Sequence, residues 1–112
     1  MASGSLDLLR GTLDLMVLRT LSDGVMHGYD VARRIRERTD DEILVLEGAL
    51  YPALHRLERR GLIESTWGFS DRNRKAKYYE LTARGRQQLR GDVAQWERYS
   101  RAVARVLALE EA

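Results

Sequence analysis

The segment EGALYPALHRLERRG, residues 47–61, decides the fold of this chain. The leucines in and before it recur at the spacing of one helical face: Leu46, Leu50, Leu54 and Leu57. This spacing predicts a helix that buries its leucine face. Pro52 has no amide hydrogen and fits best in a first helical turn, which places the helix start near Gly48 or Ala49. Gly61 supplies the left-handed residue that ends such a helix.

The opposite face of this helix is aromatic and basic, with Tyr51, His55, Arg56, Arg59 and Arg60. A rod with an apolar back and a basic front suits the DNA major groove, so we interpret it as a recognition helix. Two alternatives to DNA contact remain open. In one, Arg56 is a solvated surface arginine; in the other, Tyr51 covers the edge of the core. For Arg59 and Arg60, near the helix end, the helix macrodipole is an equally good explanation.

The composition suits one domain with one modest core, since the chain has 112 residues, 44% hydrophobic and 32% charged. The formal net charge of +2 is too small to imply a polyanionic partner, so the placement of charge has to carry that argument. No apolar run approaches the roughly 18 residues of a membrane span. The first ten residues also lack a basic leader. We therefore expect a cytoplasmic protein without membrane contact.

Residues that carry chemistry are sparse. The chain has no cysteine, and its two histidines are His27 and His55, so we expect no metal site and no cofactor. A glycine-rich phosphate loop is absent, and Asp40, Asp41 and Glu42 resemble a solvated turn more than paired catalytic acids. We therefore expect no enzyme.

Residues 6–21 are dense in apolar side chains and follow a segment, residues 1–5, that we expect to be a flexible N-terminus. One helical face would carry Leu9, Leu13, Met16, Val17 and Leu21; a second would carry Leu8, Leu15 and Leu18. Two apolar faces imply two packing partners. The helix is either a central core helix or one that also meets a second subunit through Leu8, Leu15 and Leu18. We favour the second reading, because so small a domain has little surface to wrap with.

A second helix is expected from near His27, with Tyr29, Val31, Ala32 and Ile35 on its inner face and four arginines outside. An acidic loop follows at residues 40–42, and residues 43–45 predict a short strand. A helix, a short connection and a second helix with a basic front form a helix-turn-helix.

Residues 62–67 and 77–81 predict two antiparallel strands joined by a long exposed tip at 68–76. Arg72, Arg74 and Lys75 crowd that tip, and Asn73 is a turn former. The tip is either a solvated loop or a wing that reaches phosphates or a minor groove. The expected fold is mainly α with a small β-hairpin: a winged helix-turn-helix DNA-binding domain over residues 6–81.

The last segment, residues 82–112, predicts a long dimerisation helix capped by Thr82 and ending near Leu109. Six residues recur at alternating spacings of four and three, a heptad seam that is apolar except at Ser100: Leu89, Val93, Trp96, Ser100, Val103 and Leu107. The helix would be about 40 Å long, more than this domain covers, so the seam predicts a homodimer. Trp96 either packs the dimer core or forms an aromatic wall against which a planar effector stacks.

Five motifs stand in a characteristic order: LRGTLD at 9–14, HGY at 27–29, EGALYPALHRL at 47–57, NRKAKYY at 73–79 and LTARG at 81–85. Together they resemble the PadR family of bacterial transcriptional regulators, and the single C-terminal helix is similar to its short-chain branch. The resemblance implies a dimeric winged-helix repressor, released from operator DNA by a small molecule or stress signal. Some PadR-type proteins bind flat aromatic compounds between subunits, which implies a small aromatic effector at Trp96.

Carried over by position, the family's DNA surface falls on Tyr29, Leu50, Tyr51, His55, Arg56, Arg72, Asn73, Arg74 and Lys75. Many members have Ser or Thr where this chain has Ala49, so Gly48 becomes the expected helix cap. The expected function is a sequence-specific DNA-binding regulator, a homodimeric repressor on an inverted-repeat operator of double-stranded DNA. The alternative is a winged-helix protein–protein interaction module, or a ligand-binding sensor, without direct DNA binding.

Overall fold

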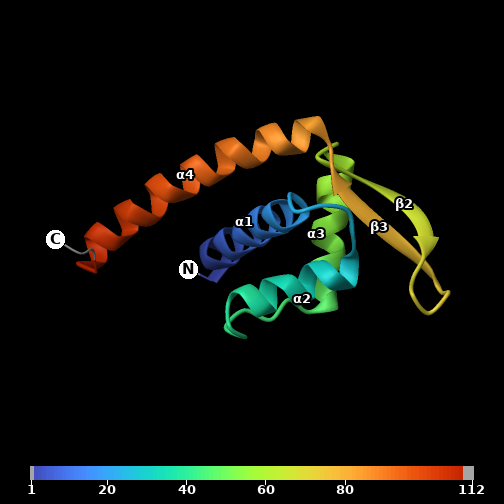
Figure 1. The fold of residues 1–112 in the computed structure, drawn as a ribbon. Helices are drawn as coiled ribbons and strands as arrows, with labels where there is room; N and C mark the ends of the chain where they lie inside the picture. The colour runs from blue at the N-terminus through green and yellow to red at the C-terminus, as the bar shows by residue number, and fades with distance from the viewer. Residues whose placement is uncertain (1, 110–112) are drawn as a thin grey trace.

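The computed structural model describes the backbone of residues 2–109 and the side chains of residues 11–109. Over this range the elements follow the order α1 (Ala2–Leu21), β1 (Met26–His27), α2 (Gly28–Arg38), α3 (Glu47–Arg59), β2 (Ile63–Phe69), β3 (Lys75–Leu81) and α4 (Ala83–Leu107). Helices α1, α2 and α3 gather beside the sheet, and α4 runs alongside α1. The β2–β3 hairpin projects at the end of the molecule opposite the C-terminal end of α4 (Figure 1). The molecule is elongated, measuring 52 × 29 × 28 Å. The predicted mainly α fold with a small β element is confirmed.

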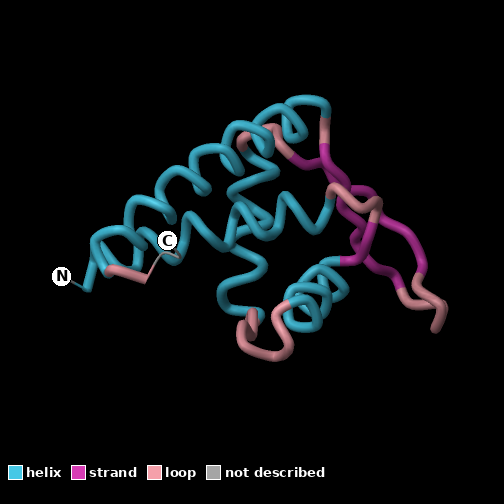
Figure 2. Tube along the Cα trace, turned by 60° about the vertical axis from the view of Figure 1, so that its left-hand side comes forward, coloured by secondary structure: helices cyan, strands magenta, loops and turns pink. Residues whose placement is uncertain are grey.

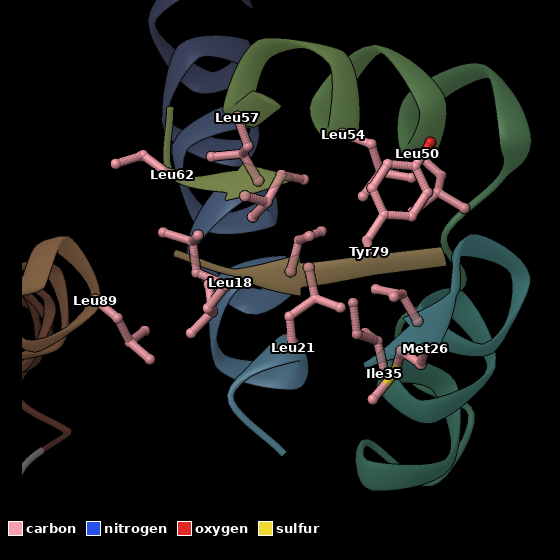
Figure 3. Packing of buried hydrophobic residues seen from close by; sticks show 14 residues of the cluster. Leu18, Leu21, Met26, Ile35, Leu50, Leu54, Leu57, Leu62, Tyr79 and Leu89 are labelled. Carbon is pink, nitrogen blue, oxygen red and sulfur yellow. The ribbon is translucent and has the colours of Figure 1, made fainter. Parts of the chain in front are cut away.

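The core lies where the first three helices meet the sheet (Figure 3). Leu50, Leu54 and Leu57 of α3 are buried, which confirms the predicted leucine face, whereas Leu46 precedes the helix and is exposed. They pack within one cluster with residues from every other helix and from the sheet, including Leu18, Leu21, Ile35, Tyr79 and Leu89. The apolar side chains spaced along α3 therefore fix which side of that helix remains outside.

Helix α1 is more deeply embedded than the two-face reading predicted. Leu18 is buried in the core of its own chain, and Leu15 packs against that core, so a subunit contact through Leu18 is wrong. The side chain of Leu8 lies outside the described residues. Residues 2–5, expected to be a flexible end, form the first turn of α1.

The sheet contains a strand that the sequence did not predict. Its order is β1-β3-β2, with Met26 paired to Tyr79 and His27 to Tyr78. Residues 43–45, predicted as a strand, are instead a loop. Positive φ angles at Asp40 and Asp41 turn the chain there, and the Thr39 hydroxyl accepts the amide hydrogen of Ile43, so a ladder does not form.

The β2–β3 hairpin, hereafter the wing, has longer strands and a shorter tip than predicted. Gly68 pairs with Ala76 and Phe69 with Lys75, which leaves residues 70–74 as the tip. Asn73 adopts a positive φ of 59°, as its turn-forming character predicted. Figure 2 shows the wing projecting from the helices.

Helix α4 begins as predicted. The Thr82 hydroxyl accepts a hydrogen bond from the amide of Gly85 at 3.0 Å and donates one to the carbonyl of Gly61 at 2.8 Å. This cap joins the start of α4 to the end of α3. The helix ends at Leu107, two residues before the expected end, where Ala108 adopts the left-handed conformation.

Candidate nucleic-acid interface

The exposed side of α3 is set by its buried leucines. Gly48, Tyr51, Pro52, His55 and Arg59 are all exposed and lie opposite the leucine face at helical spacing. We call these five residues the α3 front. Tyr51 and His55, two of the predicted contacts, thus face solvent from a rigid helix. Arg59, for which DNA contact and the helix macrodipole were equally good explanations, shares the same front.

Two predictions about α3 are wrong because the helix begins earlier than expected. It starts at Glu47, so the cap residue is Leu46, whose apolar side chain cannot cap the helix, and Gly48 lies inside. Pro52 is therefore in the second turn, not the first. Leu50 is only 2% exposed and belongs to the core, so its predicted DNA contact is also wrong.

Arg56 does not join the α3 front. Its Nη2 lies 2.8 Å from Oδ1 of Asp14, and its Nε lies 3.4 Å from Oδ2, so the guanidinium binds the carboxylate with both donors. Both side chains are partly buried between α3 and α1. Bidentate pairs of this kind hold their geometry well. The predicted DNA contact of Arg56 is corrected to a link between α3 and α1.

Helix α2 contributes an exposed aromatic residue and a set of paired cations. Tyr29 is exposed at its start, contrary to the inner-face prediction but in keeping with its predicted DNA contact. The arginines of α2 form ion pairs with nearby carboxylates: Arg33 with Asp30, Arg36 with Asp41, and Arg34 and Arg38 with Asp23. A hydrogen bond from Arg19 to Asp23, with the charge of Arg38 nearby, lowers the pKa of that carboxyl. Because these cations face carboxylates, the positive field of α2 is largely neutralised.

The wing carries exposed cations and aromatic side chains. Arg72, Asn73 and Arg74 lie exposed at the tip, as predicted, while Lys75 belongs to β3 and lies 4.9 Å from the ring centre of Trp67. Trp67, Phe69 and Lys77 also lie on the wing and were not predicted as site residues. The sequence pattern could have identified them, because alternate residues of a strand share one face of the sheet.

The wing is joined to α3 through Glu58. Its carboxylate accepts a 2.6 Å hydrogen bond from the hydroxyl of Ser65 on β2, and its Oε1 lies 3.8 Å from Nζ of Lys77 on β3. Burial and the nearby charge of Glu58 raise the pKa of the Tyr79 phenol. Glu58 therefore fixes this side of the wing to the helix that carries the α3 front.

A second feature lies between α1 and α4. A cavity of about 390 Å³ is lined by Gly11, Thr12, Asp14, Leu15, Arg60, Gln88, Asp92, Gln95, Trp96 and Tyr99. Trp96 is 41% exposed, and its ring centre lies 6.2 Å from that of Tyr99. The cavity thus combines an aromatic wall with charged groups of both signs: Asp92, Arg60 and the carboxylate of Asp14, which is paired with Arg56.

The seam of α4 divides into two parts. Leu89 is buried in the core of its own chain, so its predicted role in dimerisation is wrong. Val93, Trp96, Val103 and Leu107 continue the seam and are exposed. An exposed apolar stripe of this kind marks a surface for interaction.

The described residues offer neither a membrane-spanning helix nor a metal site. Within residues 2–109, no helix combines the length and apolarity that a membrane crossing requires. Nor do the described side chains bring together three His, Asp or Glu residues that could hold a metal ion.

Comparisons with known proteins agree with this geometry. A model of the transcriptional regulator PadR-like family matches residues 17–91. An uncharacterized protein of Lysinibacillus sphaericus is 33% identical over 90 residues, covering 80% of this chain and 83% of that protein.

Solved structures share the fold. A transcriptional regulator from Clostridium thermocellum superposes with a TM-score of 0.80 at 30% identity, covering 88% of this chain and 96% of that one. A PadR family regulator from Eggerthella lenta gives 0.76 at 33% identity, covering 97% and 93%. The fold is thus that of the PadR-like winged-helix structures. The chain belongs to the PadR-like family of transcriptional regulators, and it is a DNA-binding regulator rather than an enzyme.

Proposed function

We propose that the chain acts as a homodimeric repressor that binds an inverted-repeat operator. The observation that carries this proposal is the exposed seam of Val93, Trp96, Val103 and Leu107 along α4. In two-fold pairing, this stripe would meet its own copy, as apolar heptad positions do. The 25-residue helix extends well beyond the core it packs on, which leaves the seam free for that contact.

In such a dimer, each α3 front would enter a major groove. Tyr51 and His55 would lie nearest the base edges, with Tyr29 at the side of the groove, while Arg72, Asn73 and Arg74 of the wing would reach the backbone. Lys75 would add a phosphate contact beside them. Two-fold symmetry then places the half-sites about one helical turn apart, ~34 Å.

Selection of bound sequences from random duplexes tests this proposal. We expect enrichment of an inverted repeat whose half-sites are spaced by about one turn, ~10 base pairs, because two identical fronts read two identical sequences. Enrichment of a single half-site would contradict the dimeric reading. Failure to enrich any duplex would favour the alternative of a protein–protein interaction module or a ligand sensor.

We also propose that the cavity beside Trp96 binds a small planar aromatic effector. An aromatic wall of this kind favours flat compounds that stack on its rings. In this reading Val93, Val103 and Leu107 carry the dimer contact and a ring face of Trp96 stays open. Packing of both ring faces of Trp96 in the dimer core would leave a planar compound no face to stack on.

Fluorescence distinguishes these two roles. The chain has two tryptophans, so a Trp67→Phe variant reports Trp96 alone. We expect quenching or a spectral shift with some members of a panel of planar aromatic compounds. The Trp96→Phe variant should show neither. If the panel leaves Trp96 emission unchanged, the effector site is wrong and the dimer-core role stands.

A further inference from the structure

The two faces of the wing differ in charge. In an antiparallel pair, residues directly opposite one another point to the same side of the sheet. We call the face that carries Ser65, which contacts Glu58 of α3, the inner face of the wing, and the other its outer face. On the outer face, Glu64 lies opposite Glu80, which brings two carboxylates together. On the inner face, Lys77 lies opposite Trp67 and Lys75 opposite Phe69. Both lysines of β3 are therefore on the inner face, whereas the paired carboxylates are on the outer face.

The inner face is also where the wing exposes its largest apolar side chains. Trp67 is 63% exposed and Phe69 is 71% exposed, although the same face is buried nearer the core at Ile63 and Leu81. Nζ of Lys75 and of Lys77 lie 4.9 and 5.8 Å from the ring centre of Trp67. The lysines cover part of Trp67, but Phe69, at the end of β2, stays open to solvent.

The inner face is anchored to the helix that carries the α3 front. Ser65 and Lys77 on this face both contact Glu58 of α3, so the wing and helix are held in a fixed relation. Trp67 and Phe69 of the inner face therefore lie on a strand whose position relative to the helix of Tyr51 and His55 is fixed. The wing beyond β2, residues 70–77, carries four cations against the single carboxylate of Asp71.

We propose that Phe69 and Trp67, flanked by Lys75 and Lys77, enter the DNA minor groove beside the major-groove segment that α3 contacts. The proposal rests on the DNA-binding function proposed above. Phe69 acts as an apolar wedge against a base step, and the lysines neutralise the phosphates on either side. Charge complementarity selects this partner, since a wedge surrounded by cations suits a duplex better than an apolar protein surface.

The test uses the full-length protein and the duplex that the wild type selects. We expect Phe69→Ala to weaken binding at least about fivefold, the lower range for losing one aromatic–base contact. It should also reduce the bend of the duplex, measured by energy transfer between dyes at its two ends. The dependence of affinity on salt should stay as in the wild type, because a phenyl ring releases no counterions.

Two variants serve as controls. Thr66→Ala removes an exposed side chain from the outer face of the same strand and should leave affinity and bend unchanged. Arg74→Ala at the tip should weaken binding and make the salt dependence shallower by about one unit of slope. Because Phe69 is exposed, thermal melting of its variant should match the wild type, which separates a binding effect from unfolding.

Wild-type affinity and bend in Phe69→Ala would overturn this inference while leaving the proposed function intact. Equal losses in Phe69→Ala and Thr66→Ala would also overturn it, because the effect would not belong to the inner face. If the wild type selects no duplex at all, the proposed function and this inference both fail.

Discussion

Replacing Gly85 with alanine is expected to destabilise the fold by about 3 kcal/mol or more. A Cβ at this position would lie 2.0 Å from the carbonyl oxygen of Leu62 and 3.1 Å from Cδ2 of Leu81. Leu62 cannot simply move aside, because its carbonyl accepts the amide hydrogen of Thr82 at 3.1 Å. The start of α4 would have to shift away from the core, so Gly85 is required for close packing.

Gly91 supplies the matched control on the same helix. A Cβ there would meet no atom of the described residues within 4 Å. Gly91→Ala should therefore stabilise the helix by about 0.5–1 kcal/mol, the usual cost of glycine inside a helix. Urea unfolding followed by circular dichroism, at one protein concentration, compares the two variants with the wild type. Equal midpoints for the two variants would contradict the packing argument.

Replacing Val103 with aspartate is expected to separate the subunits and to weaken operator binding by at least about 100-fold. The seam would bring the new carboxylate and its symmetry copy into an apolar contact, where charged groups are costly. A monomer keeps only one α3 front and one wing, and so loses the second half-site. Light scattering gives the mass, and titration of the selected duplex gives the affinity.

Ala94→Asp is the control for this second prediction. Ala94 is exposed and lies on the side of α4 away from the seam, so the same carboxylate there should leave the mass and affinity unchanged. A Val103→Asp protein that keeps its wild-type mass would contradict the seam as the dimer contact. Dissociation of both variants would contradict it as well, since the effect would then be one of charge alone.

The parts of the fold that were predicted correctly depend on local patterns. The leucine face of α3 and the Thr82 cap each follow from residues within one or two helical turns. The strand β1 was missed, because two residues show no alternation and its pairing with Tyr78 and Tyr79 is distant in sequence. The strand expected at residues 43–45 does not form, because an apolar run without a partner strand makes no ladder.

The candidate site was predicted less well, because periodicity does not show which neighbour covers a residue. Leu89 and Val93 belong to one seam, but only Leu89 is buried by its own chain. Arg56 was assigned to DNA from its place on the basic face of the recognition helix, and its ion pair was not foreseen because Asp14 lies 42 positions earlier in the chain. The exposed positions of Tyr51, His55 and the tip arginines were predicted correctly, since each lies on a face or loop that local sequence defines.

The most direct test of the central claim is the mass of the wild-type protein bound to its selected duplex, measured by sedimentation equilibrium. The account predicts two chains on each inverted repeat, and two chains also in the free protein at the same concentration. One chain on each duplex, with a free protein that stays monomeric, would contradict the claim that paired α4 helices present two α3 fronts to one operator.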